Sequence, residues 1–354
     1  MAKQKGKKKT NIVVILILLV LLIGGGFFAY KIIFKKENPI QDIIDKVTED
    51  PIPAKKLNII DVNSDTRPYA VMINNLALAR PYQSGLQDAF IVYEIVVEGG
   101  ITRYLAVFKD KDNARVGSIR SARHYYLDYA LENDAIYVHW GYSPQAQSDI
   151  KRLGVNALSP DNTSGVFTRD NTIKIDSEHR GIMSLAKLDA AAKSKNVRTT
   201  IDTSKMLLNY SIDAVDLSKM EGAIPANEVA IKYSNSFVSG YAYDSGAEVY
   251  KRFVNGKEHT DYVTKAQYTA KNIITYQVRN YTIPGDTKNR QELDNVGSGK
   301  GYFISNGYAV PITWSKASRS AQTVYKYNDG TEIDVNDGNT WIQIQPQGQS
   351  LSIS

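Results

Sequence analysis

The chain has 354 residues, of which 43% are hydrophobic and none is cysteine. This length allows about two packed domains, and the lack of cysteine excludes disulfides, thiolate nucleophiles, thiolate metal sites and a lipid-modified cysteine anchor. The net charge is +6, but eight of the 43 lysines and arginines lie in the first 36 residues, which contain no acidic residue. The rest of the chain is slightly acidic, so we expect no nucleic-acid partner.

The N-terminal segment predicts a membrane anchor. Lysines at residues 3–9 precede an uncharged apolar run at residues 12–30, which is long enough to cross the hydrocarbon core as a helix. The run is longer than a usual signal-peptide core and no A-x-A-like site follows it, which favours a retained helix over a cleaved signal. We expect a cytoplasmic tail at residues 1–10, a single transmembrane anchor at 11–34 in the cell membrane, and an extracellular stalk at 35–57 that carries extracellular domains.

Residues 58–200 are predicted to form an α/β domain. Strands are expected at stretches rich in β-branched and aromatic residues. Helices are expected where Ser118 opens an amphipathic stretch, where Ser143 precedes a proline as an N-cap, and in an alanine-rich stretch near the end. The predicted strands are 69–74, 88–97, 102–108 and 135–138, and the predicted helices are 118–133, 144–153 and 182–194.

The last third of the chain has a different pattern. After a polar linker at residues 201–227, short alternating segments are separated by Asn-Gly and Asp-Gly pairs at residues 255–256, 306–307 and 329–330. Such pairs are typical of β-hairpin turns, so we predict a β-rich domain at residues 228–354. The expected fold class is α+β, with an N-terminal transmembrane helix, an α/β domain and an all-β C-terminal domain.

The stretch VGSIRSARH at residues 116–124 is a candidate anion site. Free N–H groups at a helix start favour an anion, and the guanidinium groups of Arg120 and Arg123 can each donate two parallel hydrogen bonds to a phosphate or carboxylate. A spacing of three places both arginines near one face of a helix. The alternative is that one or both of them pair with internal carboxylates such as Glu94 or Glu98.

Further polar residues follow the expected strands. His139 ends the fourth strand, where open α/β sheets commonly place ligand groups; it can act as an acid or base, or have only a structural role. Ser143 is explained by its capping role. Arg169 and His179 precede the last expected helix, and solvated loop charges are the alternative there. The histidine spacing matches no metal motif, so we expect neither a metal site nor a cofactor.

Several strings together resemble one family. They are EIVVEGGITR at residues 94–103, GSIRSAR at 117–123 and HWGYSP at 139–144, followed by Arg169-Asp170, His179, YAYD at 241–244, WSK at 314–316 and GNTWI at 338–342. Over roughly residues 60–346 the chain is similar to the YerB-like exported protein family of Gram-positive bacteria.

The resemblance implies an α/β domain followed by a β domain on the cell surface, and it does not imply an activity. Members of this family are commonly lipoproteins, so the cysteine-free anchor expected here departs from the family pattern while the surface placement is kept. The family motifs mark Glu98, Arg103, Arg120, Arg123, His139 and His179 as candidate site residues.

Two functions are compatible with these residues. The first is an envelope protein that binds an anionic cell-wall component, such as a glycan, or a partner protein of envelope assembly, with Trp314 and Trp341 of the β domain offering flat contact surfaces. The alternative is a hydrolase or transferase on envelope polymers with His139 as acid or base. No carboxylate pair or triad is visible, so we favour binding. The ligand-binding residues would be Glu98, Arg103, Arg120, Arg123, Ser143, Arg169 and His179.

Overall fold

The computed structural model describes residues 56–354. The predicted cytoplasmic tail, the transmembrane anchor and almost all of the stalk lie outside the described residues. Within residues 56–354, no helix is both long enough and apolar enough to cross a membrane. The described part is mostly β-structure with few helices and forms one compact unit.

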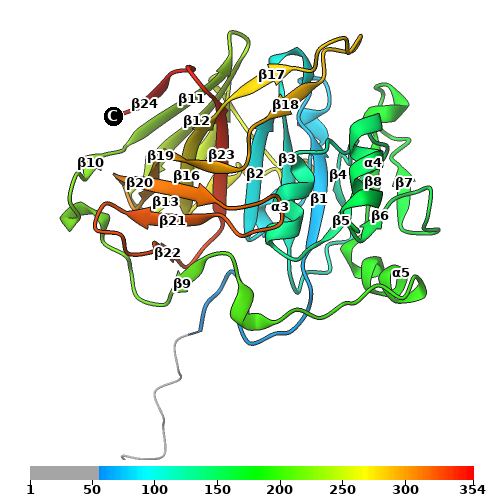
Figure 1. Cartoon of the computed structure of the whole chain (residues 1–354), viewed down its shortest axis with the longest axis horizontal. Helices are drawn as coiled ribbons and strands as arrows, with labels where there is room; N and C mark the ends of the chain where they lie inside the picture. Colours follow the sequence, from blue (N-terminus) through cyan, green and yellow to red (C-terminus); the bar gives the residue numbers. More distant parts are fainter. Residues whose placement is uncertain (1–55) are drawn as a thin grey trace, which may run out of the picture. The chain divides into compact units, whose positions relative to one another are not determined.

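A single twisted sheet crosses this unit, from β20 and β19 through β23 and β2 to β1 and β5 (Figure 1). Strand β23 pairs in parallel with β16 on one side and with β2 on the other. The segments expected to form separate domains therefore share one sheet. Its strands are β1 (Tyr69–Asn74), β2 (Ile91–Val96), β3 (Thr102–Phe108), β5 (Ile136–Val138), β6 (Ala157–Leu158), β10 (Ile224–Pro225), β16 (Asn272–Val278), β19 (Gly297–Ser305), β20 (Tyr308–Lys316), β21 (Val324–Tyr327) and β23 (Thr340–Pro346).

A second sheet packs against the middle of the first, and its order is β14-β13-β12-β11-β24 with β15 beside β13. Its strands are β11 (Glu228–Ser234), β12 (Phe237–Asp244), β13 (Val249–Val254), β14 (Lys257–Glu258), β15 (Thr269–Ala270) and β24 (Leu351–Ile353). Three small sheets complete the β-structure, namely β4 (Val116–Gly117) with β8 (Gly181–Met183) and β7 (Phe167–Arg169), β9 (Asn209–Ser211) with β22 (Asp334–Asn336), and β17 (Asn280–Thr282) with β18 (Gln291–Leu293).

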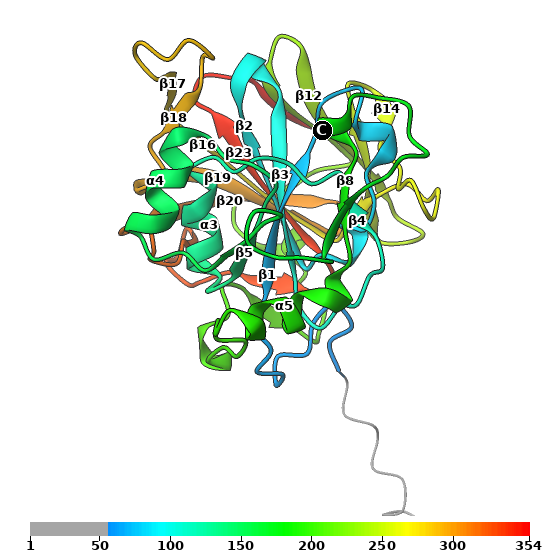
Figure 2. The ribbon, with the colours of Figure 1, turned by 90° about the vertical axis from the view of Figure 1, so that its right-hand side faces the viewer.

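The α-helices of the described residues are α3 (Tyr126–Glu132), α4 (Pro144–Arg152) and α5 (Leu188–Ser194). Figure 2 shows α3 and α4 on one side of β1 and β5, with β4 and β8 on the other. The predicted cap of α4 is confirmed, because the Ser143 hydroxyl accepts a hydrogen bond from the N–H of Ala146 at 3.1 Å.

The prediction of a helix start at Ser118 is wrong. The backbone there is extended, since the N–H of Ile119 donates to the carbonyl of Gly181 and the N–H of Arg120 donates to the carbonyl of Met72. These long-range hydrogen bonds replace the local ones that a helix needs, and α3 begins only at Tyr126. For the same reason the last helix begins later than expected, at Leu188, because the residues before it form β8.

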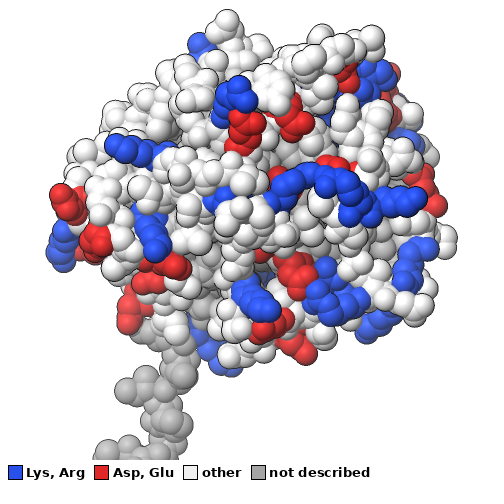
Figure 3. Space-filling view, in the orientation of Figure 1, with Lys and Arg blue, Asp and Glu red and all other residues white. Residues whose placement is uncertain are grey.

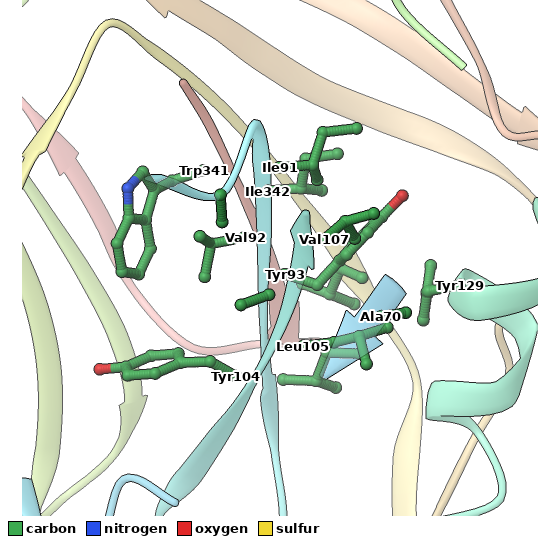
Figure 4. Close-up of a cluster of buried hydrophobic side chains, with 14 of the residues drawn as sticks. Ala70, Ile91, Val92, Tyr93, Tyr104, Leu105, Val107, Tyr129, Trp341 and Ile342 are labelled. Carbon is green, nitrogen blue, oxygen red and sulfur yellow. The ribbon is translucent and has the colours of Figure 1, made fainter. Parts of the chain in front are cut away.

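Strand β2 is buried on both faces, and every one of its residues is shielded from solvent. Tyr93 points toward α3, where its hydroxyl donates to Glu132 at 2.7 Å and its ring lies 4.9 Å from that of Tyr129. Figure 4 shows the apolar cluster around this strand, with Trp341 and Tyr104 on its other side. A strand covered by helices on one face and by a second sheet on the other forms the centre of a layered core.

The residue that follows Tyr93 points the opposite way and carries a charge into the core. Glu94 pairs with Arg252 of β13 at 2.7 Å, and both side chains are completely buried. The Glu94 carboxylate also accepts hydrogen bonds from Thr102 and Ser239, while Arg252 donates to the Tyr104 and Tyr241 hydroxyls and lies 4.0 Å from the centre of the Trp341 ring. This ion pair joins the two large sheets.

Replacing Glu94 by Gln should lower the free energy of unfolding by about 3–5 kcal/mol, because Arg252 would remain charged with no solvent and no counter-ion. Chemical denaturation measures the change, and Glu221→Gln, which alters an exposed carboxylate with no hydrogen bond or ion pair to a described residue, is the control that should leave stability unchanged. Adding Arg252→Met to Glu94→Gln should restore part of the loss. An unchanged denaturation midpoint in Glu94→Gln would contradict this account.

Candidate functional site

The candidate residues gather at one edge of the large sheet. Strands β1 and β5 are parallel, and β1 and β2 both run antiparallel to β3, so all three of β1, β2 and β5 end at the same edge. Asn74 is the last residue of β1, Glu98 follows β2, and His139 follows β5. The carboxyl ends of parallel strands are where open sheets commonly bind ligands.

The extended segment at residues 118–123 crosses this edge and places two of the predicted arginines there. Arg123 donates two hydrogen bonds to the Glu98 carboxylate, and the distance from Nη2 of Arg123 to Oε2 of Glu98 is 2.9 Å. Arg103 of β3 donates to the carbonyl of Ser121, and its Nη2 lies 3.9 Å from the same Glu98 carboxylate. Glu98 thus holds two guanidinium groups side by side. Its pairing with Arg123 agrees with the alternative prediction, in which an arginine of this segment pairs with an internal carboxylate.

Arg120 points toward a neighbouring turn formed by residues 177–179. Its Nη1 lies 3.1 Å from Oε2 of Glu178 and also donates to the Glu178 carbonyl at 3.2 Å. Ring nitrogen Nδ1 of His179 lies 2.9 Å from the side-chain nitrogen Nδ2 of Asn74, and ring nitrogen Nε2 lies 3.3 Å from Oε1 of Glu178. The side chain of Glu178 is 59% exposed, whereas that of Arg120 is only 18% exposed.

Two further contacts hold the same turn. Arg169 donates to the carbonyl of Ser177, and the hydroxyl of Ser118 donates to the carbonyl of His179. Arg169 also lies over the Trp140 ring, with its guanidinium carbon 4.3 Å from the ring centre. The carbonyls of residues 177, 178 and 179 are therefore each bound by a side chain from another segment, which gives the turn a defined position.

The electrostatics of this edge are set by Arg103, Arg120 and Arg123, which we call the arginine cluster. Burial and the nearby charge of Arg123 lower the pKa of Arg103 to about 10. Burial tends to raise the pKa of Glu98, but hydrogen bonding and the charge of Arg123 hold it below its usual value. Burial and the charge of Arg120 lower the pKa of His179, so this ring favours its neutral form.

The charges around the arginine cluster do not balance. Three guanidinium groups face the carboxylates of Glu98 and Glu178, and each carboxylate interacts with more than one arginine. An environment with one excess positive charge favours an additional anion. The prediction that a helix start would help to bind the anion was wrong, however. Arg103 lies on strand β3, Arg120 and Arg123 lie on an extended segment, and α3 begins only after them, at Tyr126.

The remaining predicted residues lie apart from the cluster or serve the fold. The His139 ring is buried against Tyr137, with Nδ1 2.8 Å from the carbonyl of Gly141, and within residues 56–354 no carboxylate forms a hydrogen bond or ion pair with it. Ser143 caps α4. Within the same residues, no three His, Asp or Glu side chains are arranged to hold a metal ion.

Sequence reasoning missed Asn74, Trp140 and Glu178. Glu178 precedes His179 in the chain, but adjacency alone does not distinguish a site carboxylate from a surface one. The expected contact surfaces at Trp314 and Trp341 are not available, because both rings are buried in the core. Tyr142, which is 40% exposed and lies beside His139, is an accessible aromatic ring close to the site.

The His139 environment predicts an abnormal titration. Burial, the largest cause, lowers its pKa below the ordinary 6.5, although the Gly141 carbonyl opposes the shift. Because the folded pKa lies below the unfolded one, the contribution of His139 to stability should be constant above about pH 6.5 and fall as the pH decreases. NMR titration, with His139→Gln to assign the signal, should give a midpoint below that of a free histidine. A midpoint at or above it would contradict the burial argument.

Comparison with known proteins agrees with this architecture. Residues 57–198 match the N-terminal domain, and residues 229–342 the C-terminal domain, of the family described as "Protein of unknown function (DUF3048)". The chain is 32% identical over 298 residues to a Bacillus subtilis protein named "Putative lipoprotein YerB", covering 82% of this chain and 85% of that protein. The crystal structure of Bacillus subtilis YerB has a TM-score of 0.69 at 29% identity and covers 82% of this chain and 94% of that chain. The chain therefore belongs to the YerB-like DUF3048 family.

Proposed function

We propose that this protein is a membrane-anchored extracellular envelope protein that binds an anionic cell-wall component, or an anionic group of an envelope partner, at the arginine cluster. The observation that carries the proposal is the excess of guanidinium groups at the edge where β1, β2 and β5 end. Guanidinium groups form bidentate hydrogen bonds with phosphates and carboxylates. A partly buried position makes such bonds stronger than in open solvent.

The two carboxylates at the cluster have different roles in this proposal. Glu98 is mostly buried and fixes Arg123 and Arg103, so it positions the cluster. Glu178 is exposed and contacts Arg120 through a surface ion pair, which contributes little stability. An incoming phosphate or carboxylate can replace the Glu178 side chain on Arg120 while the Glu98 contacts stay in place. Glu178 then acts as a removable counter-ion.

The proposed envelope location is supported by sequence features and by the similarity to the Bacillus subtilis protein. The apolar run at residues 12–30 between lysines has the pattern of a signal-anchor, and the similar Bacillus subtilis protein carries the name of a lipoprotein. Both features suit a protein held at a membrane with its folded part outside.

The alternative function, a hydrolase or transferase with His139 as acid or base, has less support. The Gly141 carbonyl orients the His139 ring through Nδ1, but His139 is only 2% exposed, so a polymer has little access to its other ring nitrogen. A histidine that acts as acid or base must lie within hydrogen-bond reach of its substrate. No specific contact favours this function over binding.

Replacing Arg120 by Ala should weaken binding of an anionic ligand by about 1.5–3 kcal/mol, the range for a hydrogen bond to a charged group. Calorimetric titration of the full chain in detergent with teichoic acid fragments, muropeptides and inorganic phosphate measures the change. Arg198→Ala is the matched control, because Arg198 also pairs with a single carboxylate, that of Asp134, which precedes β5 at the opposite edge of the sheet.

Glu178→Gln separates a ligand site from a structural one. If Glu178 competes with the ligand, this variant should bind the same anions more tightly than the natural chain, whereas a purely structural role would leave affinity unchanged or lower it. Equal affinity of the natural chain and Arg120→Ala for every anion tested would overturn the proposal.

A further inference from the structure

A hairpin beside the arginine cluster carries further positive charge. Strand β8 pairs with β7 on one side and with β4 on the other, so the loop at residues 170–180, which joins β7 to β8, lies next to the extended segment at 118–123. Together, residues 115–123 and 169–180 contain six lysines and arginines but only three acidic residues. The positive charge of the cluster therefore continues onto the hairpin.

One guanidinium group of the hairpin has no carboxylate partner. Figure 3 shows a face of the molecule on which acidic and basic side chains lie among each other, and Arg115, Arg120 and Arg123 each pair with a carboxylate. Arg169 differs from them, because within residues 56–354 it forms no ion pair and donates only to the carbonyl of Ser177. Its half-buried charge is in contact with no carboxylate of the described chain.

The Trp140 ring holds the Arg169 guanidinium without occupying its hydrogen-bond donors. The guanidinium carbon lies 4.3 Å from the ring centre, and a cation–π contact of this kind uses no N–H group. Only Nη1 of Arg169 donates to a described residue, although Nε and Nη2 are donors as well. The group is thus held in position while donors that suit a phosphate or carboxylate stay unused.

Arg169 and Arg120 are bound to neighbouring points of one turn. Nη1 of Arg120 donates to the carbonyl of Glu178 at 3.2 Å. Arg169 donates to the carbonyl of Ser177, the residue before it, and consecutive residues are only about 3.8 Å apart. The backbone N–H of Trp140 also donates to the carbonyl of Arg120 at 3.1 Å. The ring beneath one guanidinium group therefore belongs to a residue bonded to the arginine that carries the other.

We propose that Arg169 forms a second anion subsite beside the arginine cluster, and that the ligand is a chain with repeated anionic groups, of which one binds at Arg120 and another at Arg169. This inference rests on the proposed function and specifies the class of its ligand. Chains of phosphodiesters and chains of acidic sugars share this chemistry. Once the first group is bound, the second is held at a high effective concentration, so an oligomer gains affinity that a monomer lacks.

The test compares monomers and oligomers of the same anion. Calorimetric titration of the full chain in detergent at pH 7 uses glycerol 3-phosphate beside a synthetic glycerol phosphate trimer, and galacturonic acid beside trigalacturonic acid. We expect one trimer to bind about tenfold or more tightly than its monomer, which exceeds the roughly threefold gain that three equivalent groups give by statistics alone. The arm in which this occurs identifies the anion as a phosphate or a carboxylate.

Arg169→Gln locates the second subsite. The glutamine amide can still donate to the Ser177 carbonyl, so the turn keeps this contact while the charge is removed. The affinity for the trimer should fall to within about threefold of that for the monomer, because only one group is then held by an arginine. The affinity for the monomer should not change, since Arg120 is intact.

Lys300→Ala is the matched control. Lys300 is exposed and pairs with no carboxylate of the described residues, but it lies on β19 in the other half of the large sheet. Its loss removes the same charge from the protein and should change neither affinity.

The outcomes separate this inference from the proposed function. Equal binding of monomer and trimer by the natural chain in both arms would contradict the second subsite and leave the proposed anion binding in place, and this comparison does not depend on the folding of any variant. An equal loss of monomer and trimer affinity in Arg169→Gln would show that Arg169 only positions the turn, which also overturns the inference. Failure of the natural chain to bind any of these anions would contradict the proposed function as well.

Discussion

The ion pair between Glu94 and Arg252 connects the parts of this structure that would otherwise be separate. Glu94 lies on a fully buried strand of the large sheet and Arg252 on the second sheet, so their contact defines how the two sheets face each other. A buried charge pair requires accurate geometry to offset desolvation. Here that geometry comes from the surrounding hydroxyls and the Trp341 ring, which satisfy the remaining polar atoms and leave few alternative packings.

The same strand connects the core to the candidate site. Tyr93 contacts α3 from one face of β2, and Glu94 contacts the second sheet from the other. Four residues after Glu94, beyond the end of the strand, Glu98 pairs with Arg103 and Arg123. The position of Arg103 and Arg123 therefore depends on strands that are buried at every residue. A site built on strand ends holds its charged groups close together at little entropic cost during binding, because their conformations are already limited before a ligand arrives.

Local patterns were a good guide wherever local forces decide the structure. Strands β1 and β3 occur at their predicted residues, and Ser143 caps α4 as its position before Pro144 indicated. The residues after Ser118 have a helical pattern, but pairing with Gly181 and Met72 overrides it. No local pattern indicates that β23 pairs with β2, or that Glu178 reaches Arg120, because these contacts join segments far apart in the chain. The family motifs identified the arginines and Glu98, but not Glu178, the partner of Arg120.

The position of β23 has a consequence for how the protein folds during its synthesis. This strand, at residues 340–346 of 354, lies in the middle of the large sheet rather than at its edge. Until it arrives, β2 and β16 each expose an unpaired side, and such open edges are prone to join other chains. The protein therefore cannot assemble progressively as it is made, and nearly the whole chain has to be present before its central layer closes. Loss of residues 340–354 would open the centre of the protein rather than trim its surface.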